Sequence, residues 1–530
     1  MRPWKRNDAA HRKPNPTDSI TMLRLILATT LVGLALAPNS PAAEIPDRPE
    51  KLTYPELRYE PPKPSDYRVP LKSGPIAYLV PDRELPLVNV QVMIRCGSYL
   101  EPGGKAGLAD FTGHLLVRGG TATQSPEALE ERLAFLAAGL TSGIGDEQGT
   151  VNLNLLSKDL PEGLKLLRDV LTAPRFETNR LALYRQQTIQ AMQQRNDDSA
   201  DIEARELAYL SYGPDFWSNR FPTRKSVESL TPEDLHAFHR KWFHPANFVV
   251  AVNGDFDRTQ MIAALETVFG DWPFSGETPP PIPTNAVLAK PGVYVVNKEV
   301  NQGRVSVLLP GVKRDHPDFI ALQIMNDILG GGGFTSRIMN RVRSDEGLAY
   351  GASSHFPGGV EFAHPFQAAF QSKSRTVTYA SSIILDEINR ISSTAVSDAE
   401  LQTAKRSFVD TFPEHFNTKG KVATTFARDE FTGRFAQTPD YWSTWRDKVE
   451  GVTADDVKRV AAKHLHPDEA VILIVGQSEE VAKGHPDHPV KLTQLASGKV
   501  TELPLRDPLT LEPLPAAAVT APATPAKKAE

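Results

Sequence analysis

Two residues that can bind a metal ion lie four positions apart early in the chain. The segment 107–121 reads GLADFTGHLLVRGGT and places Asp110 and His114 one turn apart on an expected helix. Both are zinc ligand types, but a catalytic zinc needs a third protein ligand and a base for its bound water. The pattern favours a helix-surface pair over a functional zinc site and leaves a weak, non-catalytic metal contact open.

A second segment, 329–351, reads LGGGGFTSRIMNRVRSDEGLAYG. Its four glycines, Gly330–Gly333, predict a mobile loop with open backbone groups. Thr335 or Ser336 is expected to cap the helix that follows. The helix then turns into a strand, so that Arg343 and Tyr350 stand on either side of the corner.

Simpler interpretations of the same residues stay open. Gly330–Gly333 can be a flexible connector, Arg343 can form an ordinary surface ion pair, and Tyr350 can be a buried core ring. Spacing alone does not separate Arg343 from Arg337 and Arg341.

No nucleophile presents itself elsewhere. The sequence contains no Gly-x-Ser-x-Gly motif. Its single cysteine, Cys96, rules out an internal disulfide, and an alternating apolar run at 90–96 predicts a buried strand thiol. Ordinary surface or helix-end positions are expected for four histidines: His236, His239, His464 and His466.

An internal duplication organises the chain. Residues 227–254 match residues 449–476 at a constant offset, each copy with a capping threonine (Thr231 or Thr453), a helix ending at His-Pro, and an apolar strand ending at glycine. Strand-like runs are expected at 90–96, 149–155, 248–253, 304–309 and 471–475. Amphipathic helices are expected at 126–138, 161–172, 178–195, 379–391 and 398–411. The pattern predicts an α+β fold in which a helix-covered sheet occurs twice.

Proline-rich stretches divide the chain into regions. The predicted regions are a signal peptide and leader (1–43), a Pro-rich N-terminal segment (44–72), an N-terminal domain (73–275), a linker (276–292), a C-terminal domain (293–505) and a disordered Pro/Ala tail (506–530). The 530 residues are 40% hydrophobic and 23% charged, as in globular proteins, and a net charge of -5 gives no basis for nucleic-acid binding.

The N-terminus has the order of a secretory signal. Basic residues precede the apolar run 25–37, and Ser-Pro-Ala-Ala follows at 40–43. This predicts export, to a bacterial periplasm, with no stable membrane span after cleavage. Met22 can be the true start, and an uncleaved anchor is the alternative.

Both motif segments resemble those of the insulinase/pitrilysin-type zinc peptidases, an inverted-zincin family that includes mitochondrial processing peptidases. The resemblance places Asp110 and Gly113 where the family has its first zinc histidine and its catalytic glutamate, whereas His114 matches the second histidine. The third ligand position falls near Ala191, and 179–196 contains no acid or histidine. The resemblance therefore implies that this chain binds no cofactor of its own.

The same resemblance implies a role for the second segment. Arg343 and Tyr350 match a family pair that reaches the zinc site, holds the substrate backbone and steadies charge on the scissile carbonyl. Gly330–Gly333 match a loop that holds incoming peptide. The family fold implies two homologous domains joined into a clam-like chamber.

Some family members divide these parts between two subunits. The chain is therefore predicted to be the non-catalytic, complementing subunit of an exported peptidase, with zinc on a homologous partner and peptide as substrate. The main alternative is a structural or peptide-binding scaffold without a catalytic contribution. A self-sufficient hydrolase with another set of residues is the third reading.

Overall fold

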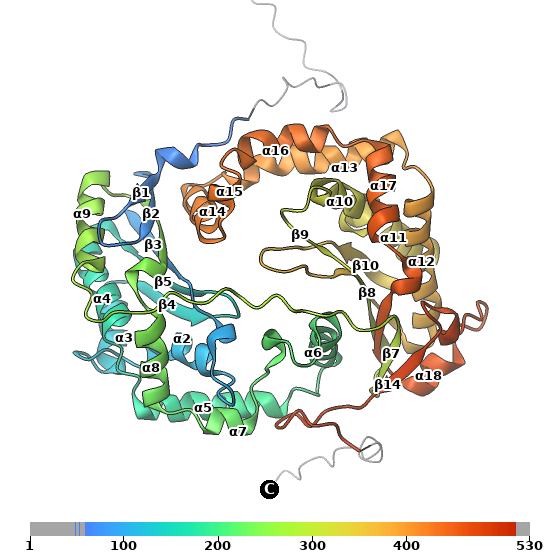
Figure 1. The fold of residues 1–530 in the computed structure, drawn as a ribbon, viewed down its shortest axis with the longest axis horizontal. Helices are drawn as coiled ribbons and strands as arrows, with labels where there is room; N and C mark the ends of the chain where they lie inside the picture. Colours follow the sequence, from blue (N-terminus) through green and yellow to red (C-terminus); the bar gives the residue numbers. More distant parts are fainter. Residues whose placement is uncertain (1–47, 49–51, 53–58, 516–530) are drawn as a thin grey trace, which may run out of the picture. The chain divides into compact units, whose positions relative to one another are not determined.

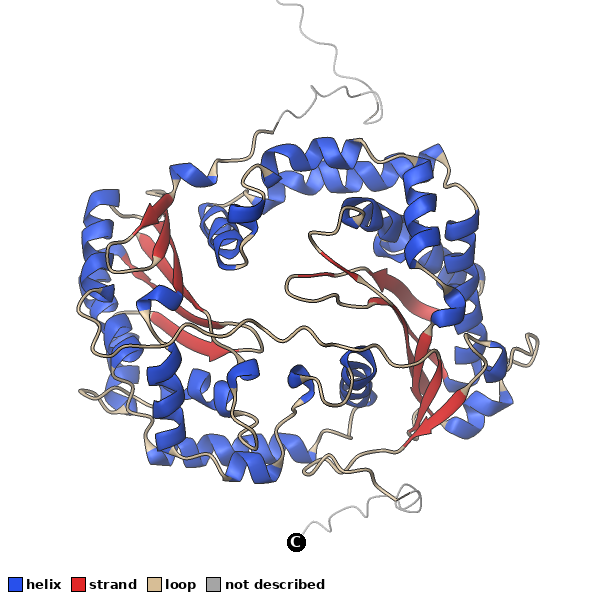
Figure 2. Ribbon diagram, viewed as in Figure 1, coloured by secondary structure: helices blue, strands red, loops and turns tan. Residues whose placement is uncertain are grey.

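Two six-stranded sheets, each with helices packed against it, form most of the described chain in this computed structural model (Figures 1 and 2). The structure describes residues 48, 52 and 59–515. The predicted signal peptide and leader (1–43), and residues 516–530 of the tail, lie outside the described residues. Among the described residues, no helix has the length and apolar character to cross a membrane.

The first sheet has the strand order β1-β2-β6-β3-β5-β4. Its strands are β1 (Arg68–Pro70), β2 (Ile76–Pro81), β3 (Leu87–Ile94), β4 (Gly139–Ile144), β5 (Gly149–Leu156) and β6 (Phe248–Gly254). The helices of this half are α2 (Leu108–Arg118), α3 (Pro126–Phe135), α4 (Leu160–Thr172), α5 (Thr178–Gln193), α6 (Ser199–Tyr212), α7 (Arg224–Glu228), α8 (Pro232–Trp242) and α9 (Arg258–Phe269). Alternate residues of β3 are buried, because every second side chain faces the helices.

The second sheet repeats this arrangement with the order β10-β12-β8-β13-β7-β14. Its strands are β7 (Gly292–Asn297), β8 (Gln302–Leu309), β10 (Ala349–His355), β12 (Phe366–Lys373), β13 (Val471–Gly476) and β14 (Val500–Leu503), and β9 (Val312–Lys313) pairs separately with β11 (Gly358–Gly359). The helices are α10 (Phe319–Asn326), α11 (Arg337–Met339), α12 (Val377–Ser393), α13 (Asp398–Thr411), α14 (Lys419–Phe431), α15 (Arg434–Gln437), α16 (Tyr441–Glu450), α17 (Ala454–His464) and α18 (Ser478–Lys483).

The predicted α+β fold with two related domains is confirmed. Strands β3, β5, β6, β8 and β13 overlap the five predicted strand runs, and α3, α4, α5, α12 and α13 overlap the five predicted helices, with β3, α3 and α5 ending two or three residues early. The duplicated segments have the same local structure. Thr231 caps α8 and Thr453 caps α17, each in a reciprocal capping box with the aspartate three residues later.

Each domain also contributes one helix to the sheet of the other. Helix α6 packs on β13 and β8, where Ile202 and Leu210 join a core cluster with Val471 and Leu473. Helix α14 packs on β6 and β2, and its buried Phe426 contacts aromatic rings of the first domain. The two helices occupy corresponding places in the duplicated halves, so the exchange is reciprocal.

Ion pairs and hydrogen bonds tie α14 to the first sheet. Glu430 accepts two hydrogen bonds from the Arg68 guanidinium, at 2.8 and 3.0 Å, and one from the Tyr78 hydroxyl at 2.8 Å. The Arg95 guanidinium lies 4.6 Å from the ring centroid of Phe431. The two halves are thus joined by side-chain contacts as well as by the linker.

Three predictions about the segments outside the sheets are corrected. Part of the Pro-rich segment 44–72 belongs to the first sheet, because Arg68–Pro70 pairs with β2 as an edge strand, where proline is tolerated. Part of the tail, residues 506–515, is also ordered: Arg506 donates to Glu206 at 3.0 Å and lies over Tyr209. Cys96 is buried as predicted, but it lies two residues beyond the end of β3.

Candidate functional site

The helix α2 carries the first motif, and a buried carboxylate fixes its start. Glu101 accepts hydrogen bonds from the backbone N–H groups of Gly107, at 3.1 Å, and Ala109, at 2.7 Å. These are free donors at a helix N-terminus, which an acidic group satisfies well. Burial nevertheless raises the pKa of Glu101 to about 7, against these two hydrogen bonds.

At Gly113, α2 lies directly against the edge strand β4. A methyl group added at this position would fall far inside van der Waals contact of the backbone nitrogen of Ile144 and the backbone of Gly143. The Ser142 hydroxyl donates to the carbonyl oxygen of Gly113 at 2.6 Å and holds the contact. The position that the family resemblance assigns to a catalytic glutamate is therefore filled by a strand.

Tyr184 occupies the space between the two candidate ligands on α2. Its hydroxyl donates to a carboxylate oxygen of Asp110 at 2.9 Å, and its ring stacks on the imidazole of His114 with centroids 3.7 Å apart. Packing around the Asp110 carboxyl, which keeps solvent contact on one side, raises its pKa, whereas burial lowers the pKa of His114. Asp110 and His114 are thus brought together as the helix-surface pair, with Tyr184 between them.

These residues do not fit a catalytic zinc. Asp110 and His114 already contact Tyr184, and no side chain fits at Gly113. Ala191 lies exposed on α5 and has no atom that could bind a metal.

The glycine run in the second domain has more structure than predicted. Gly330 and Gly331 belong to a π-helical turn (Asp327–Gly331), and the N–H of Gly332 donates to the carbonyl of Asp327 at 2.8 Å. Gly330 is buried, and a methyl group added there would collide with the side chain and backbone of Ser354 on β10. The segment is a packed turn whose exposed positions are Gly331 and Gly333, rather than an open loop.

The predicted hydroxyl cap after the glycines is also wrong. Ser336 stands at the N-cap position of α11, but its hydroxyl donates back to the carbonyl of Gly333 at 2.7 Å. The Thr335 hydroxyl donates to the carbonyl of Gly332 at 2.9 Å. Both hydroxyls satisfy carbonyls of the glycine turn, because that turn leaves carbonyls without helical partners.

The three arginines of this segment have different partners. Arg337 is nearly buried and makes two hydrogen bonds to Glu400, at 2.6 and 3.1 Å. Arg341 lies 3.3 Å from Asp345 and 3.6 Å from Glu387. Within the described part of the chain, Arg343 makes no ion pair. Geometry therefore selects Arg343 as the guanidinium that is available to a ligand.

Arg343 lies between two exposed aromatic rings. Its guanidinium carbon is 4.7 Å from the ring centroid of Phe334 and 5.5 Å from that of Tyr350. Tyr350 is 92% exposed, which excludes the core-ring alternative, and Phe334 is 70% exposed. Such rings hold a cation in place without neutralising it. Phe334 is the residue that sequence reasoning missed, although its place just after the glycines was a usable signal.

The two motif groups are separate in this chain. Among residues 59–515, no hydrogen bond or ion pair joins Asp110, His114 or Tyr184 to Arg343 or Tyr350. The structure brings together Arg343 with Tyr350, and Asp110 with His114, but each group lies in its own domain.

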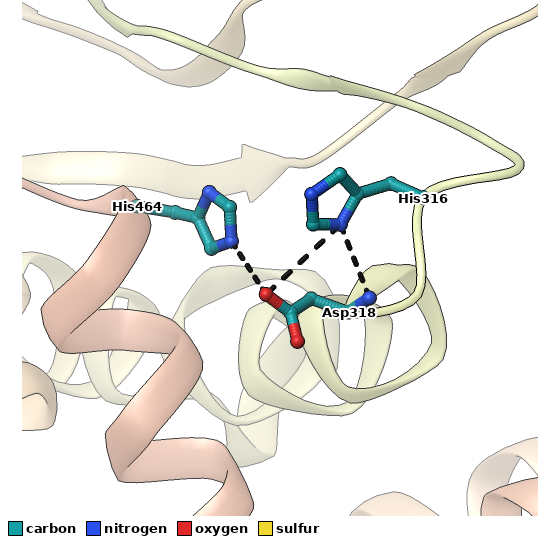
Figure 3. A group of neighbouring side chains, drawn as sticks. All are labelled: His316, Asp318 and His464. Carbon is teal, nitrogen blue, oxygen red and sulfur yellow. Dashed lines mark hydrogen bonds and ion pairs between the residues drawn. The ribbon is translucent and has the colours of Figure 1, made fainter.

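One further cluster, shown in Figure 3, contains metal-ligand types: His316, Asp318 and His464. Asp318 precedes α10, and His464 ends α17. The Asp318 carboxylate already binds Arg459 at 2.8 Å, Lys463 at 2.8 Å and His464 at 2.9 Å.

The basic side chains around Asp318 determine its charge and its availability to a metal ion. Burial alone would raise the pKa of Asp318, but hydrogen bonds from His464, Lys463 and Arg459 outweigh it and lower the pKa far below its usual range. The Nδ1 lone pair of His316 accepts the backbone N–H of Asp318 at 3.1 Å. Two permanent cations on the carboxylate oppose a metal ion, so the cluster fastens α17 to α10.

One histidine prediction is corrected. His239 is 1% exposed, and its Nε2 lies 2.9 Å from the carbonyl oxygen of Leu171. Burial lowers its pKa to about 4. It is a neutral core histidine rather than a surface or capping residue.

The structure thus consists of two related α+β domains, and the helix of the first motif, α2, lacks the residues for a catalytic zinc. Family models agree with this description. The model for insulinase (peptidase family M16) matches residues 79–209, and the model for the peptidase M16 inactive domain matches residues 229–408. The chain belongs to the insulinase, or M16, peptidase family, of which it is a degenerate member.

Two curated proteins and one solved structure illustrate what this chain is similar to. An uncharacterised zinc protease of Mycobacterium leprae is 28% identical over 50% of this chain, a match that spans 60% of the relative's length. A probable mitochondrial-processing peptidase subunit beta of Arabidopsis thaliana is 23% identical over 74% of this chain and 75% of its own. The crystal structure of a peptidase M16 inactive domain from Pseudomonas fluorescens has a TM-score of 0.69 and 25% identity, covering 77% of this chain and 97% of that one.

Proposed function

We propose that this chain is the complementing subunit of an M16 zinc peptidase, in which a partner chain carries the zinc. The observation that supports this most is the state of Arg343: it has no carboxylate partner in the described chain and is held between the exposed rings of Phe334 and Tyr350. An arginine kept charged and accessible is suited to hold a peptide carbonyl. The probable processing-peptidase relative is itself named as a subunit.

Each residue has a distinct part in this proposal. Arg343 and the Tyr350 hydroxyl donate hydrogen bonds to the substrate carbonyl oxygen, which becomes negative as the peptide bond is attacked. The exposed glycines, Gly331 and Gly333, present backbone groups to the incoming peptide. The partner's zinc would supply the activated water. The signal-like residues 25–43 further support a function outside the cytoplasm. N-terminal sequencing of the exported protein would test whether this segment is removed.

The test is peptidase activity of the purified chain, alone and mixed with a homologue that has a complete zinc motif. We expect activity only in the mixture, and a loss of about 100-fold with Arg343→Ala, the scale of removing one oxyanion donor. Arg341→Ala is the matched control, because Arg341 belongs to the same segment as Arg343 but is engaged in ion pairs.

The scaffold alternative gives the opposite result. If Arg343→Ala and Tyr350→Ala leave the activity of the mixture unchanged while both variants still bind the partner, the chain contributes structure without chemistry. Zinc bound stoichiometrically by the chain alone, with activity, would contradict both readings.

A further inference from the structure

Two adjoining cavities lie among α10, α13, α15 and α16, apart from both motif groups. Their volumes are about 280 and 290 Å³, and they share the side chains of Phe319, Ile320, Arg434 and Tyr441. We call this combined space the α10–α16 cleft. A space of this size, with a few polar groups on apolar walls, is typical of small-ligand sites.

One wall of the α10–α16 cleft is aromatic. Phe319, Tyr441 and Trp442 are each partly exposed where they line it. The Trp442 indole N–H donates to Asp429 at 2.6 Å, which fixes the ring. The Arg434 guanidinium lies 4.2 Å from the ring centroid of Tyr441. The wall is therefore rigid and offers flat ring surfaces to an apolar group.

The charge around the cleft is positive. Arg434 is paired with Asp429 at 3.3 Å, but among the described residues neither Arg314 nor Lys448 makes an ion pair. The Arg314 guanidinium donates to the backbone carbonyl of Thr432 at 2.8 Å. The acidic residue that lines the cleft, Asp315, is 3.4 Å from Lys313, which neutralises it.

The surroundings of Arg314 also disfavour its charge. Burial and the nearby Arg434 lower the pKa of Arg314, which means that its charged form is less stable than in water. An anion placed between Arg314 and Arg434 would relieve both effects.

We propose that the α10–α16 cleft binds a ligand in which an aromatic group is joined to a carboxylate. The ring packs on Phe319, Tyr441 and Trp442, and the carboxylate faces Arg314, with Lys448 at the edge. A free aromatic acid and the C-terminal residue of a peptide have the same chemistry. The inference is independent of the complementing role, because it uses none of the residues Phe334, Arg343 and Tyr350.

Calorimetric titration of the full chain, without any partner, tests the proposal. The probes are N-acetyl-phenylalanine, its amide, and N-acetylglycine. We expect the first to bind and the other two to bind at least about tenfold more weakly, since each lacks one of the two recognised groups. Equal binding of the acid and the amide, or no binding of the acid, would overturn the proposal.

Variants locate the site. Arg314→Gln and Lys448→Gln should weaken binding of the acid, by about tenfold for Arg314, and should leave the amide unaffected. Arg406→Gln on α13 is the matched control, because Arg406 is exposed and lines neither cavity. Lys448 is exposed, so its variant stays informative if Arg314→Gln fails to fold. Acid affinities equal to the control in both variants would place the ligand elsewhere.

A tetrapeptide, Gly-Gly-Gly-Phe, separates the two sources of the ligand. Tighter binding than N-acetyl-phenylalanine supports a peptide C-terminus as the natural ligand. Weaker binding supports a free aromatic acid. Binding of the C-terminally amidated tetrapeptide with the same affinity as the free acid form would count against the proposal.

Discussion

In both domains a glycine of the motif region packs directly against an edge strand of the sheet. In the first domain, Gly113 lets α2 lie against Ile144 of the edge strand β4. In the second, Gly330 lets the turn after α10 lie against Ser354 of the edge strand β10. Each strand occupies the same end position in its sheet. Gly113 is therefore a packing residue with a counterpart in the other domain.

After this shared contact the two domains differ. Helix α2 continues to Arg118, and Tyr184 covers its candidate ligands. The second domain instead turns through its glycines and leaves Phe334 and Tyr350 exposed around Arg343. In the first domain, protein side chains thus cover the motif residues. In the second domain, the guanidinium of Arg343 stays accessible to a ligand.

The largest predicted effect concerns the exchanged helices. Phe426→Ala, in α14, should lower the free energy of unfolding by about 4 kcal/mol, and Ile202→Ala, in α6, by about 3 kcal/mol, because both side chains are fully buried. Hydrogen exchange should show the first change in β6 and the second in β13, each in the domain that does not contain the substitution. Protection lost only in the mutated domain would disprove the reciprocal exchange.

Gly113→Ala tests whether the first motif is closed. The added methyl group meets the backbone of β4, so we expect a loss of about 3 kcal/mol or a failure to fold, measured by chemical denaturation. Gly143→Ala is the control: it lies on β4 in the same contact, but its added methyl group has no heavy atom within 4 Å. Equal stability of the two variants would show that α2 can move away from the strand.

Local rules account for the part of the fold that the sequence predicts well. The capping boxes at Thr231 and Thr453, and the apolar alternation of β3, each depend on residues within one element. Arg343 and Tyr350 were singled out by the family resemblance, since their spacing alone does not separate Arg343 from Arg337 and Arg341.

Contacts between distant segments account for what could not be predicted. Tyr184 lies 74 positions from Asp110, and no local pattern announces their hydrogen bond. The ordered structure of residues 506–515 includes a hydrogen bond from Arg506 to Glu206, which lies 300 positions away. The pairing of Arg337 depends in the same way on Glu400, which belongs to another helix.

In each domain, a carboxylate with a raised pKa makes the free energy of unfolding depend on pH over a different range. The folded-state pKa of Glu101, about 7, lies above the unfolded value of 4.5, so the folded state holds this proton more tightly. Its contribution is present below pH 4.5 and is lost as pH rises to about 7, on the order of 3 kcal/mol. Glu101→Gln should remove this slope from unfolding measurements across that range.

Asp327 of the glycine turn provides the comparison for Glu101. Burial raises its pKa to about 6 from 3.8, so Asp327→Asn should remove a slope of the same steepness over a lower pH range, which ends near pH 6. If both variants remove the pH dependence of the free energy of unfolding over the same interval, the two carboxylates do not titrate as independent groups.

The smallest predicted effect concerns Tyr184. Tyr184→Phe keeps the ring on His114 but removes the hydrogen bond to Asp110, so we expect a loss of about 1 kcal/mol in the free energy of unfolding. The pKa of Asp110 should rise further, because this hydrogen bond lowers it, and carboxyl NMR titration would measure the change. Tyr184→Ala would uncover Asp110 and His114 together, yet zinc should still not bind at stoichiometric concentration, because Ala191 offers no third ligand. Tight zinc binding by that variant would show that Tyr184 alone closes the first motif and that the contact at Gly113 is secondary.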